Sequence, residues 1–197
     1  MSAPPPPADL ARRKPLVVEL PAGSLLHRFH HAAYAPLFFD RSRAGRLNAP
    51  DGGYGVLYAA AGSAGAFAET FLREPGRTLL PPDLLRGRAY AVFTARDPMR
   101  LIGLSGRGLA RLGATAEVVH GGLPYDLPQQ WSGALRGAFP WAEGIAYRAR
   151  HDDDEVCYAI FERDPASLPL LRRERELDAE WFWDLAEAYG VGLTPSA

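Results

Sequence analysis

Apolar residues in this chain form short runs separated by prolines and glycines, a pattern typical of a domain with many short elements. Runs rich in β-branched, aromatic and alanine residues predict six strands, at residues 24–30, 54–60, 89–95, 116–119, 144–149 and 156–162. Helical patterns predict four helices, at residues 63–74, 106–112, 128–137 and 178–189. Because no regular helical crossovers connect the strands, the pattern favours an α+β fold over a parallel α/β fold.

Two of the expected helices carry recognisable end signals. Ser63 is the expected N-cap of the first helix, and Asp178 is the expected N-cap of the last. Gly190 follows the end of the last helix, where glycine is common. Within that helix Trp181 and Leu185 lie four positions apart, so we expect them on a face that packs against the core.

Composition predicts one soluble domain. The chain has 197 residues, of which 47% are hydrophobic and 23% charged. We expect a disordered proline-rich tail over residues 1–15 and a single folded domain over residues 16–197. A formal net charge of -1 provides no global field for nucleic acid or an anionic membrane, so neither is an expected partner. The arginines scattered over residues 86–111 are expected on a solvated face.

Three further features narrow the class of protein. Cys157 is the only cysteine, which excludes an intramolecular disulfide and a cysteine-based zinc site, and it fits a cytoplasmic location. The acidic run His151–Glu155 is expected to be a solvated turn rather than a metal site, and no metal is expected elsewhere. The stretch Gly103–Gly108 lacks both the Walker lysine and the dinucleotide fingerprint, so it is interpreted as a loop that starts a helix.

An arginine, a tyrosine and a glutamate follow one another at intervals of about a dozen residues. Each has a simple interpretation: Arg46 as a solvated loop residue, Tyr58 as a half-buried strand residue and Glu69 as the partner of Arg73 in an exposed ion pair. The functional interpretation places Glu69 in a cleft, with Tyr58 as a wall for a flat ring and Arg46 as a phosphate ligand. Arg28, inside an expected strand, is a weaker candidate for phosphate binding.

Four short motifs occur in one order along the chain: Gly45-Arg46-Leu-Asn, Val56-Leu-Tyr58-Ala, Ala66-Phe-Ala-Glu69 and Gly144-Ile-Ala-Tyr147-Arg-Ala-Arg150. Together they resemble the RES domain, a family named for an arginine, a glutamate and a serine, over residues 24–192. The resemblance implies an ADP-ribosyltransferase-like mixed β core around an NAD-binding cleft, with short flanking helices. It also implies NAD as substrate with no required cofactor, phosphate as a possible co-substrate, and an Xre-type antitoxin as partner of a toxin.

The resemblance assigns roles to individual positions. Arg46, Tyr58 and Glu69 match the family's arginine, tyrosine and glutamate, and Arg28 matches an N-terminal arginine that lines the same pocket. Ala149 departs from the pattern because it stands where the family has serine. The hydroxyl absent at position 149 would bind phosphate or orient the nucleophile, and one hydrogen bond to a charged group is worth about 1.5–3 kcal/mol.

The implied reaction breaks the nicotinamide–ribose bond of NAD. Nicotinamide is already a cationic leaving group, so no general acid is needed, and a carboxylate beside the oxocarbenium-like ribose stabilises the transition state. This predicts that Glu69 stabilises the sugar, Tyr58 packs on nicotinamide, and Arg46 and Arg28 bind phosphates.

Three functions remain open from the sequence. The first is an NAD phosphorylase that acts as a toxin. The second is a mono-ADP-ribosyltransferase that modifies a protein. The third is a catalytically weakened or silent member that only binds a nucleotide or its antitoxin, which Ala149 favours.

Overall fold

Eight strands form one mixed sheet in the computed structural model, which describes residues 4–76 and 78–193. The strands follow the order β1-β6-β7-β8-β3-β2-β5-β9. Neighbouring strands are antiparallel except for the parallel pair β6–β7. Their bounds are β1 Leu16–Leu20, β2 Leu25–His31, β3 Val56–Ala60, β5 Arg88–Thr94, β6 Met99–Gly103, β7 Gly144–Ala149, β8 Asp152–Phe161 and β9 Leu170–Glu174. The expected α+β class is confirmed.

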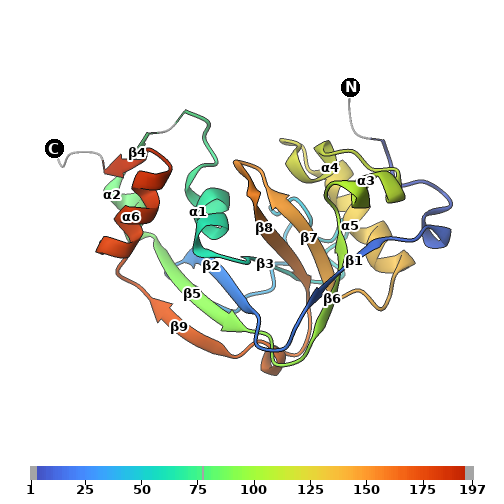
Figure 1. The fold of residues 1–197 in the computed structure, drawn as a ribbon, viewed down its shortest axis with the longest axis horizontal. Coiled ribbons are helices and arrows are strands. Elements are labelled where there is room, and N and C mark those ends of the chain that lie inside the picture. Colours follow the sequence, from blue (N-terminus) through green and yellow to red (C-terminus); the bar gives the residue numbers. More distant parts are fainter. Residues whose placement is uncertain (1–3, 77, 194–197) are drawn as a thin grey trace.

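Six α-helices accompany this sheet in the described residues. They are α1 Ser63–Phe71, α2 Pro82–Arg86, α3 Arg107–Leu112, α4 Glu117–His120, α5 Asp126–Ala138 and α6 Glu180–Ala188. In Figure 1 the sheet forms an open arc, with α1 above its middle, α2 and α6 at one end, and α3, α4 and α5 at the other. The short strands β4 (Leu79–Leu80) and β10 (Gly192–Leu193) pair in parallel beside α2 and α6.

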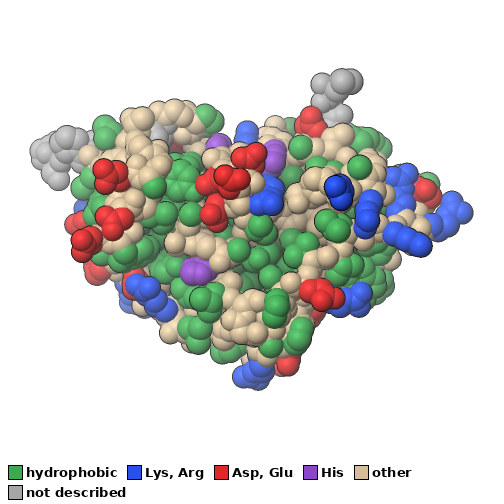
Figure 2. Space-filling model, in the orientation of Figure 1, with side chains coloured by type: hydrophobic (Ala, Val, Ile, Leu, Met, Phe, Trp, Pro, Cys, Tyr) green, Lys and Arg blue, Asp and Glu red, His purple; other side chains and the backbone are tan. Residues whose placement is uncertain are grey.

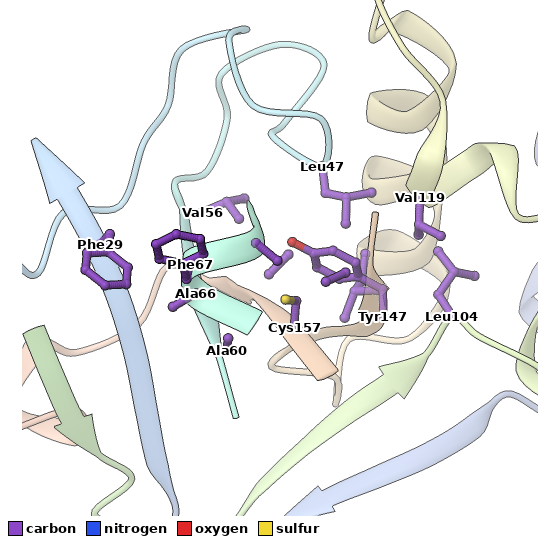
Figure 3. Close-up of a cluster of buried hydrophobic side chains, with 14 of the residues drawn as sticks. Phe29, Leu47, Val56, Ala60, Ala66, Phe67, Leu104, Val119, Tyr147 and Cys157 are labelled. Carbon is purple, nitrogen blue, oxygen red and sulfur yellow. The ribbon is translucent and has the colours of Figure 1, made fainter. Parts of the chain in front are cut away.

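Apolar side chains pack on both faces of the sheet, as the alternation along each strand requires. The larger cluster lies on the α1 side, where Phe29 contacts Phe71 with ring centroids 5.1 Å apart. Figure 3 shows Phe29 and Phe67 at one side of this cluster and Tyr147 and Cys157 near its middle. The second cluster, on the opposite face, includes Leu26, Leu57 and Ile160.

The pairing of β3 is complete on one side only. Five consecutive pairs join β3 to β8, from Val56 opposite Phe161 to Ala60 opposite Cys157. On its other side β3 pairs with β2 at one position, His27 opposite Ala60. The two strands then separate, although β2 itself pairs with β5 along its whole length. The sheet therefore opens between β2 and β3.

The helix starts differ from the two expected N-caps. Gly62, not Ser63, is the N-cap of α1, and the Gly65 N–H in the first turn donates to Glu155 Oε2 of β8 at 3.1 Å. A distant carboxylate thus takes the place of a local cap. Ala179, not Asp178, caps α6, because Asp178 accepts from Trp183 Nε1 at 2.7 Å instead. The expected glycine after α6 is confirmed, since Gly190 has a φ of +66°.

The strand expected at residues 116–119 is wrong, because this segment forms the one-turn helix α4. Val118 and Val119 suggested a strand, yet both side chains are buried and no neighbouring strand pairs with them. Local hydrogen bonds satisfy the backbone instead: His120 N–H donates to Ala116 O at 2.9 Å and Gly121 N–H donates to Glu117 O at 2.7 Å. Tertiary packing outweighs strand propensity in so short a segment.

The N-terminal segment differs from the tail expected over residues 1–15. Leu10 belongs to the larger apolar cluster and is 5% exposed. The carbonyl of Pro4 accepts a hydrogen bond from Trp131 Nε1 of α5 at 2.8 Å. A buried leucine and a paired indole attach the described residues of this segment to the domain.

Candidate active site

A cavity of about 370 Å³ lies where β2 and β3 separate. Its walls come from β2, β3, α1, the loop that precedes β3 and the turn between β7 and β8. Figure 2 shows histidine side chains and charges of both signs near the upper centre of the molecule. The cavity brings together four residues singled out from the sequence, namely Arg28, Arg46, Tyr58 and Glu69.

Glu69 reaches the cavity from α1. Its Oε1 accepts a hydrogen bond from the backbone N–H of Arg150, in the β7–β8 turn, at 2.7 Å. The exposed ion pair with Arg73 does not form, because Arg73 Nε donates to the backbone carbonyl of Glu69 at 2.8 Å. The carboxylate is therefore held between α1 and the end of β7, and its second oxygen has no partner among residues 4–76 and 78–193.

Tyr147 and Cys157 surround this carboxylate on the inner side of the cavity. Burial raises the pKa of the Tyr147 hydroxyl well above its ordinary value, and the nearby Glu69 charge raises it further. Burial also raises the pKa of the Cys157 thiol, again with a contribution from Glu69. Figure 3 draws the Tyr147 hydroxyl directed toward the side of Ala66 and Phe67. Both groups are therefore neutral at physiological pH.

Tyr58 presents its ring to the cavity and holds the preceding loop with its hydroxyl. The hydroxyl donates to Asn48 Oδ1 at 2.9 Å and accepts from the Leu47 N–H at 2.7 Å. Burial raises the pKa of this hydroxyl, so it remains protonated. The residue expected to be a ring wall is also a structural anchor.

The Gly-Arg-Leu-Asn motif is explained by close packing around Asn48. Asn48 Nδ2 donates to Asp40 Oδ2 at 2.9 Å and to the Ser42 carbonyl at 2.7 Å. A Cβ at Gly45 would lie 2.2 Å from Asn48 Oδ1 and 2.7 Å from the Tyr58 hydroxyl oxygen. Glycine at position 45 therefore permits the loop to close, and this closure positions Arg46 beside it.

Arg46 is oriented across the cavity mouth. Its Nε donates to the carbonyl of Gly121 at 3.1 Å, and its guanidinium lies 5.5 Å from the centre of the Tyr125 ring. Its two terminal nitrogens have no hydrogen-bond partner within the described part of the chain. This arrangement leaves a planar fork available to a phosphate or carboxylate.

Arg28 occupies the opening between the separated strands. Its Nη1 donates to the carbonyl of Tyr58 at 2.9 Å, a group that a continued β2–β3 ladder would bring opposite Phe29. Its Nε is buried and has no hydrogen-bond partner among residues 4–76 and 78–193. Burial lowers the pKa of Arg28 to about 10, so the side chain is still charged at neutral pH. A buried cation with an unpaired donor favours an anionic ligand.

Ala149 does not line the cavity, although its position matches the family serine. The side chain is fully buried in the larger apolar cluster. Tyr147 and Arg150, on either side of it, do line the cavity. The structure thus separates Ala149 from the other four expected site residues.

Several residues of the cavity wall were not expected from the sequence. Tyr147 and Arg150 stood in a recognised motif, which was the available signal for them. Arg88, expected on a solvated face, is half-buried in the wall, and burial together with the nearby Arg73 charge lowers its pKa. The only signal for Arg88 in the sequence was its position directly before the strand expected at residues 89–95.

Neither a metal site nor a membrane-spanning helix is found in the described residues. No group of three or more histidine, cysteine, aspartate or glutamate side chains in residues 4–76 and 78–193 is arranged to hold a metal ion. No helix in the same ranges is long and apolar enough to cross a membrane.

These features define a class of site. It is a cleft lined by arginines, at the point where two strands of a mixed sheet separate, with an aromatic side chain in its wall and one hydrogen-bonded carboxylate. Comparison with known families then identifies the chain as a member of the RES-domain family, whose model matches residues 25–182. The family expected from the motifs is confirmed.

One solved structure extends this comparison to the whole fold. The crystal structure of the M. tuberculosis MbcT–MbcA toxin–antitoxin complex contains a similar chain, with a TM-score of 0.67 at 16% sequence identity. The similarity covers 92% of this chain and 98% of that one. No curated protein matches the sequence.

Proposed function

We propose that this protein cleaves the nicotinamide–ribose bond of NAD and transfers the ADP-ribosyl group to inorganic phosphate. The observation that carries the proposal is the Glu69 carboxylate, held at 2.7 Å by the Arg150 N–H in a cavity shared with Tyr58 and Arg28. A fixed carboxylate beside a cationic cleft suits a substrate with a positive reacting sugar and negative phosphates.

The bond changes balance without a cofactor. The bond between the anomeric carbon and the nicotinamide nitrogen breaks, and its electron pair leaves with nicotinamide, which becomes neutral. A phosphate oxygen forms the new bond to the anomeric carbon and gives ADP-ribose phosphate. Glu69 stabilises the positive ribose while the old bond is longer and the new one incomplete.

The remaining residues bind and orient the substrate. The Tyr58 ring lines the same cavity as Glu69 and would pack on nicotinamide. Arg28 and Arg46 both line the cavity and would hold the pyrophosphate or the incoming phosphate. Ala149 is fully buried, so its missing hydroxyl removes no group from the cavity wall.

We further propose that the protein is the toxin of a toxin–antitoxin pair, with an Xre-type antitoxin as its partner. Membership of the RES-domain family supports this proposal. So does the similarity to a chain of the MbcT–MbcA toxin–antitoxin complex. Co-expression with the product of a neighbouring gene should relieve growth arrest if that product is the antitoxin.

The reaction is tested by incubation of the purified protein with NAD, with and without inorganic phosphate. We expect nicotinamide release that depends on phosphate, together with formation of ADP-ribose phosphate. Glu69→Gln should lower the rate by about 10²- to 10³-fold, the loss typical when one preorganised electrostatic group is removed. Glu187→Gln, on the exposed surface of α6, is the matched control and should leave the rate unchanged.

Other outcomes identify the alternatives. Release without phosphate, with label from radioactive NAD transferred to protein, would establish a mono-ADP-ribosyltransferase. Retained activity of Glu69→Gln would reject the assigned role of the carboxylate. Binding of NAD without any turnover would establish a silent member of the family.

A further inference from the structure

Two aromatic side chains stand exposed at the rim of the cavity, in the loop that follows β2. Tyr34 is 62% exposed and Phe38 is 49% exposed, yet both belong to the cavity wall. Their ring centroids lie 6.2 Å apart with planes 23° from parallel, and the His31 ring lies 5.1 Å from that of Tyr34. The rim therefore presents a row of three flat rings.

Hydrogen bonds to backbone atoms hold the segment that carries His31 and Tyr34. Arg173 of β9 donates through Nη2 to the carbonyls of Ala32 and Tyr34, at 3.4 and 3.1 Å. The Tyr34 N–H donates to the His31 carbonyl at 3.0 Å. The backbone at Tyr34 is thus held in place, while the side chains of Tyr34 and Phe38 remain exposed. Large apolar rings kept exposed beside a cavity are typical of a binding surface.

Tyr125 is a less suitable ring for stacking on a ligand. Tyr125 also lines the cavity, but the guanidinium of Arg46 already lies 5.5 Å from its ring centre. Among the phenylalanine and tyrosine rings of the cavity wall, Tyr34 and Phe38 are the most exposed. A second flat ring of a ligand would therefore stack on Tyr34 and Phe38, in the loop that follows β2.

The positions along β2 fit a ligand with phosphates between two rings. Arg28 lies three residues before His31, and a strand advances about 3.3 Å per residue, so about 10 Å separates them along β2. Arg88 also lines the cavity and lies opposite His31 on β5. Positive charge therefore lies between the rim and the Tyr58 end of the cavity.

We propose that Tyr34 and Phe38 stack on the adenine ring of NAD and make the site selective for the dinucleotide over the nicotinamide mononucleotide. This inference rests on the proposed function, because it assigns the end of the substrate that does not react. Each stacked base–aromatic contact typically changes affinity by about 5- to 150-fold.

The test compares NAD with nicotinamide mononucleotide, which has the same scissile bond but lacks the adenylate. We expect Tyr34→Ala/Phe38→Ala to lower kcat/KM for NAD by about 5- to 150-fold and to leave kcat/KM for the mononucleotide unchanged. Tyr34→Phe keeps the ring and should behave as wild type. A similar loss for both substrates, or no loss for NAD, would overturn the assignment. So would a loss specific for NAD in Tyr125→Ala but not in the rim variant.

A binding measurement separates this inference from the proposed reaction. If the wild-type protein releases no nicotinamide from either substrate, the proposed reaction fails, and calorimetry with AMP still tests the rim. AMP binding that is lost in Tyr34→Ala/Phe38→Ala and kept in Tyr34→Phe supports the stacking site. Equal AMP binding by wild type and the double variant, or no AMP binding by either, rejects it.

Discussion

The two edges of β3 differ in how their backbone groups are satisfied. Toward β8, five consecutive residue pairs form a regular ladder. Toward β2 the ladder stops after one pair, and the Arg28 guanidinium supplies the hydrogen bond to the Tyr58 carbonyl. The closed edge contributes stability through packing and regular pairing. The open edge replaces backbone donors with a charged side chain that also faces the cavity.

This difference shows how one strand contributes to both core and site. Leu57 points to the second apolar cluster, while Tyr58 points to the cavity, because successive side chains alternate across the sheet. An open ladder gives a ligand access to the middle of the sheet, where a closed ladder would leave no room. Changes at the open edge should therefore affect ligand binding, and changes at the closed edge mainly folding.

Replacement of Arg28 tests the open edge of β3 most directly. Arg28→Lys keeps the charge but loses the planar fork that contacts the Tyr58 carbonyl and that we propose binds an anionic ligand. Since a hydrogen bond to a charged group is worth about 1.5–3 kcal/mol, we expect KM for NAD or phosphate to rise by about 10- to 100-fold. Steady-state kinetics with each substrate varied in turn measures the change.

Arg43→Lys is the matched control, since Arg43 pairs with Asp126 outside the cavity wall. It should leave both KM values unchanged. Ile160→Val tests the closed edge and should lower the free energy of unfolding by about 0.5–1.5 kcal/mol without altering KM. An unchanged KM in Arg28→Lys would contradict the proposed role of the open edge.

Tyr58→Phe separates the ring from its hydroxyl. The ring wall remains, but Asn48 Oδ1 and the Leu47 N–H lose their partner. We expect the free energy of unfolding to fall by about 1–3 kcal/mol, measured by urea denaturation, with a rise in KM because the Arg46 loop is less well held. Tyr54→Phe removes a buried hydroxyl that bonds Ser132 Oγ away from the cavity, so it should lower stability without changing KM.

His30 gives the open edge a dependence on pH. Its Nδ1 lies 2.9 Å from the His31 carbonyl and so donates to it. Its Nε2 is buried and has no hydrogen-bond partner in the described part of the chain. Burial lowers the pKa of His30 from 6.5 to about 4. Between these values the unfolded chain binds a proton that the folded protein does not, so stability should fall as pH decreases from 6.5 to 4. Thermal melts across this range should show a weaker decline for His30→Gln than for the exposed control His31→Gln.

Ala149→Ser should have the smallest effect on activity. Because Ala149 is fully buried and absent from the cavity wall, a new hydroxyl would not reach the ligand directly. We expect nicotinamide release to change by less than about tenfold, which is smaller than the change from a hydrogen bond made in the transition state. A gain near 100-fold would show that position 149 contacts the reacting groups and that wild type is disabled there.

Much of the fold could be predicted where the pattern was strong and local. The strand at residues 144–149 has the bounds of β7, and α1, α3, α5 and α6 were each expected within a few residues. Three strands of the main sheet were missed, namely β1, β6 and β9. β1 and β9 form the two edges of the sheet, and β6 is the neighbour of β1. In β9, Leu170–Glu174, leucine and charged side chains are exposed. Their pairing depends on distant residues that no local pattern identifies.

Several residues of the site could be predicted from the sequence, but their contacts and orientations could not. Spacing and motifs selected Arg46, Tyr58 and Glu69, and the fold brings them to one cavity. The contact between Glu69 and the Arg150 N–H joins residues 81 positions apart, so no local sequence signal indicated it. The burial of Ala149 was equally inaccessible, since a motif aligns positions but does not say which way a side chain points.

The loop that presents Arg46 is held by hydrogen bonds within the protein itself. Asn48 ties it to Asp40 and to the Ser42 carbonyl, and the Tyr58 hydroxyl ties it to β3. Its conformational entropy is therefore lost during folding rather than on association. Binding then carries little penalty for ordering this part of the site, which favours fast capture of substrate from dilute solution.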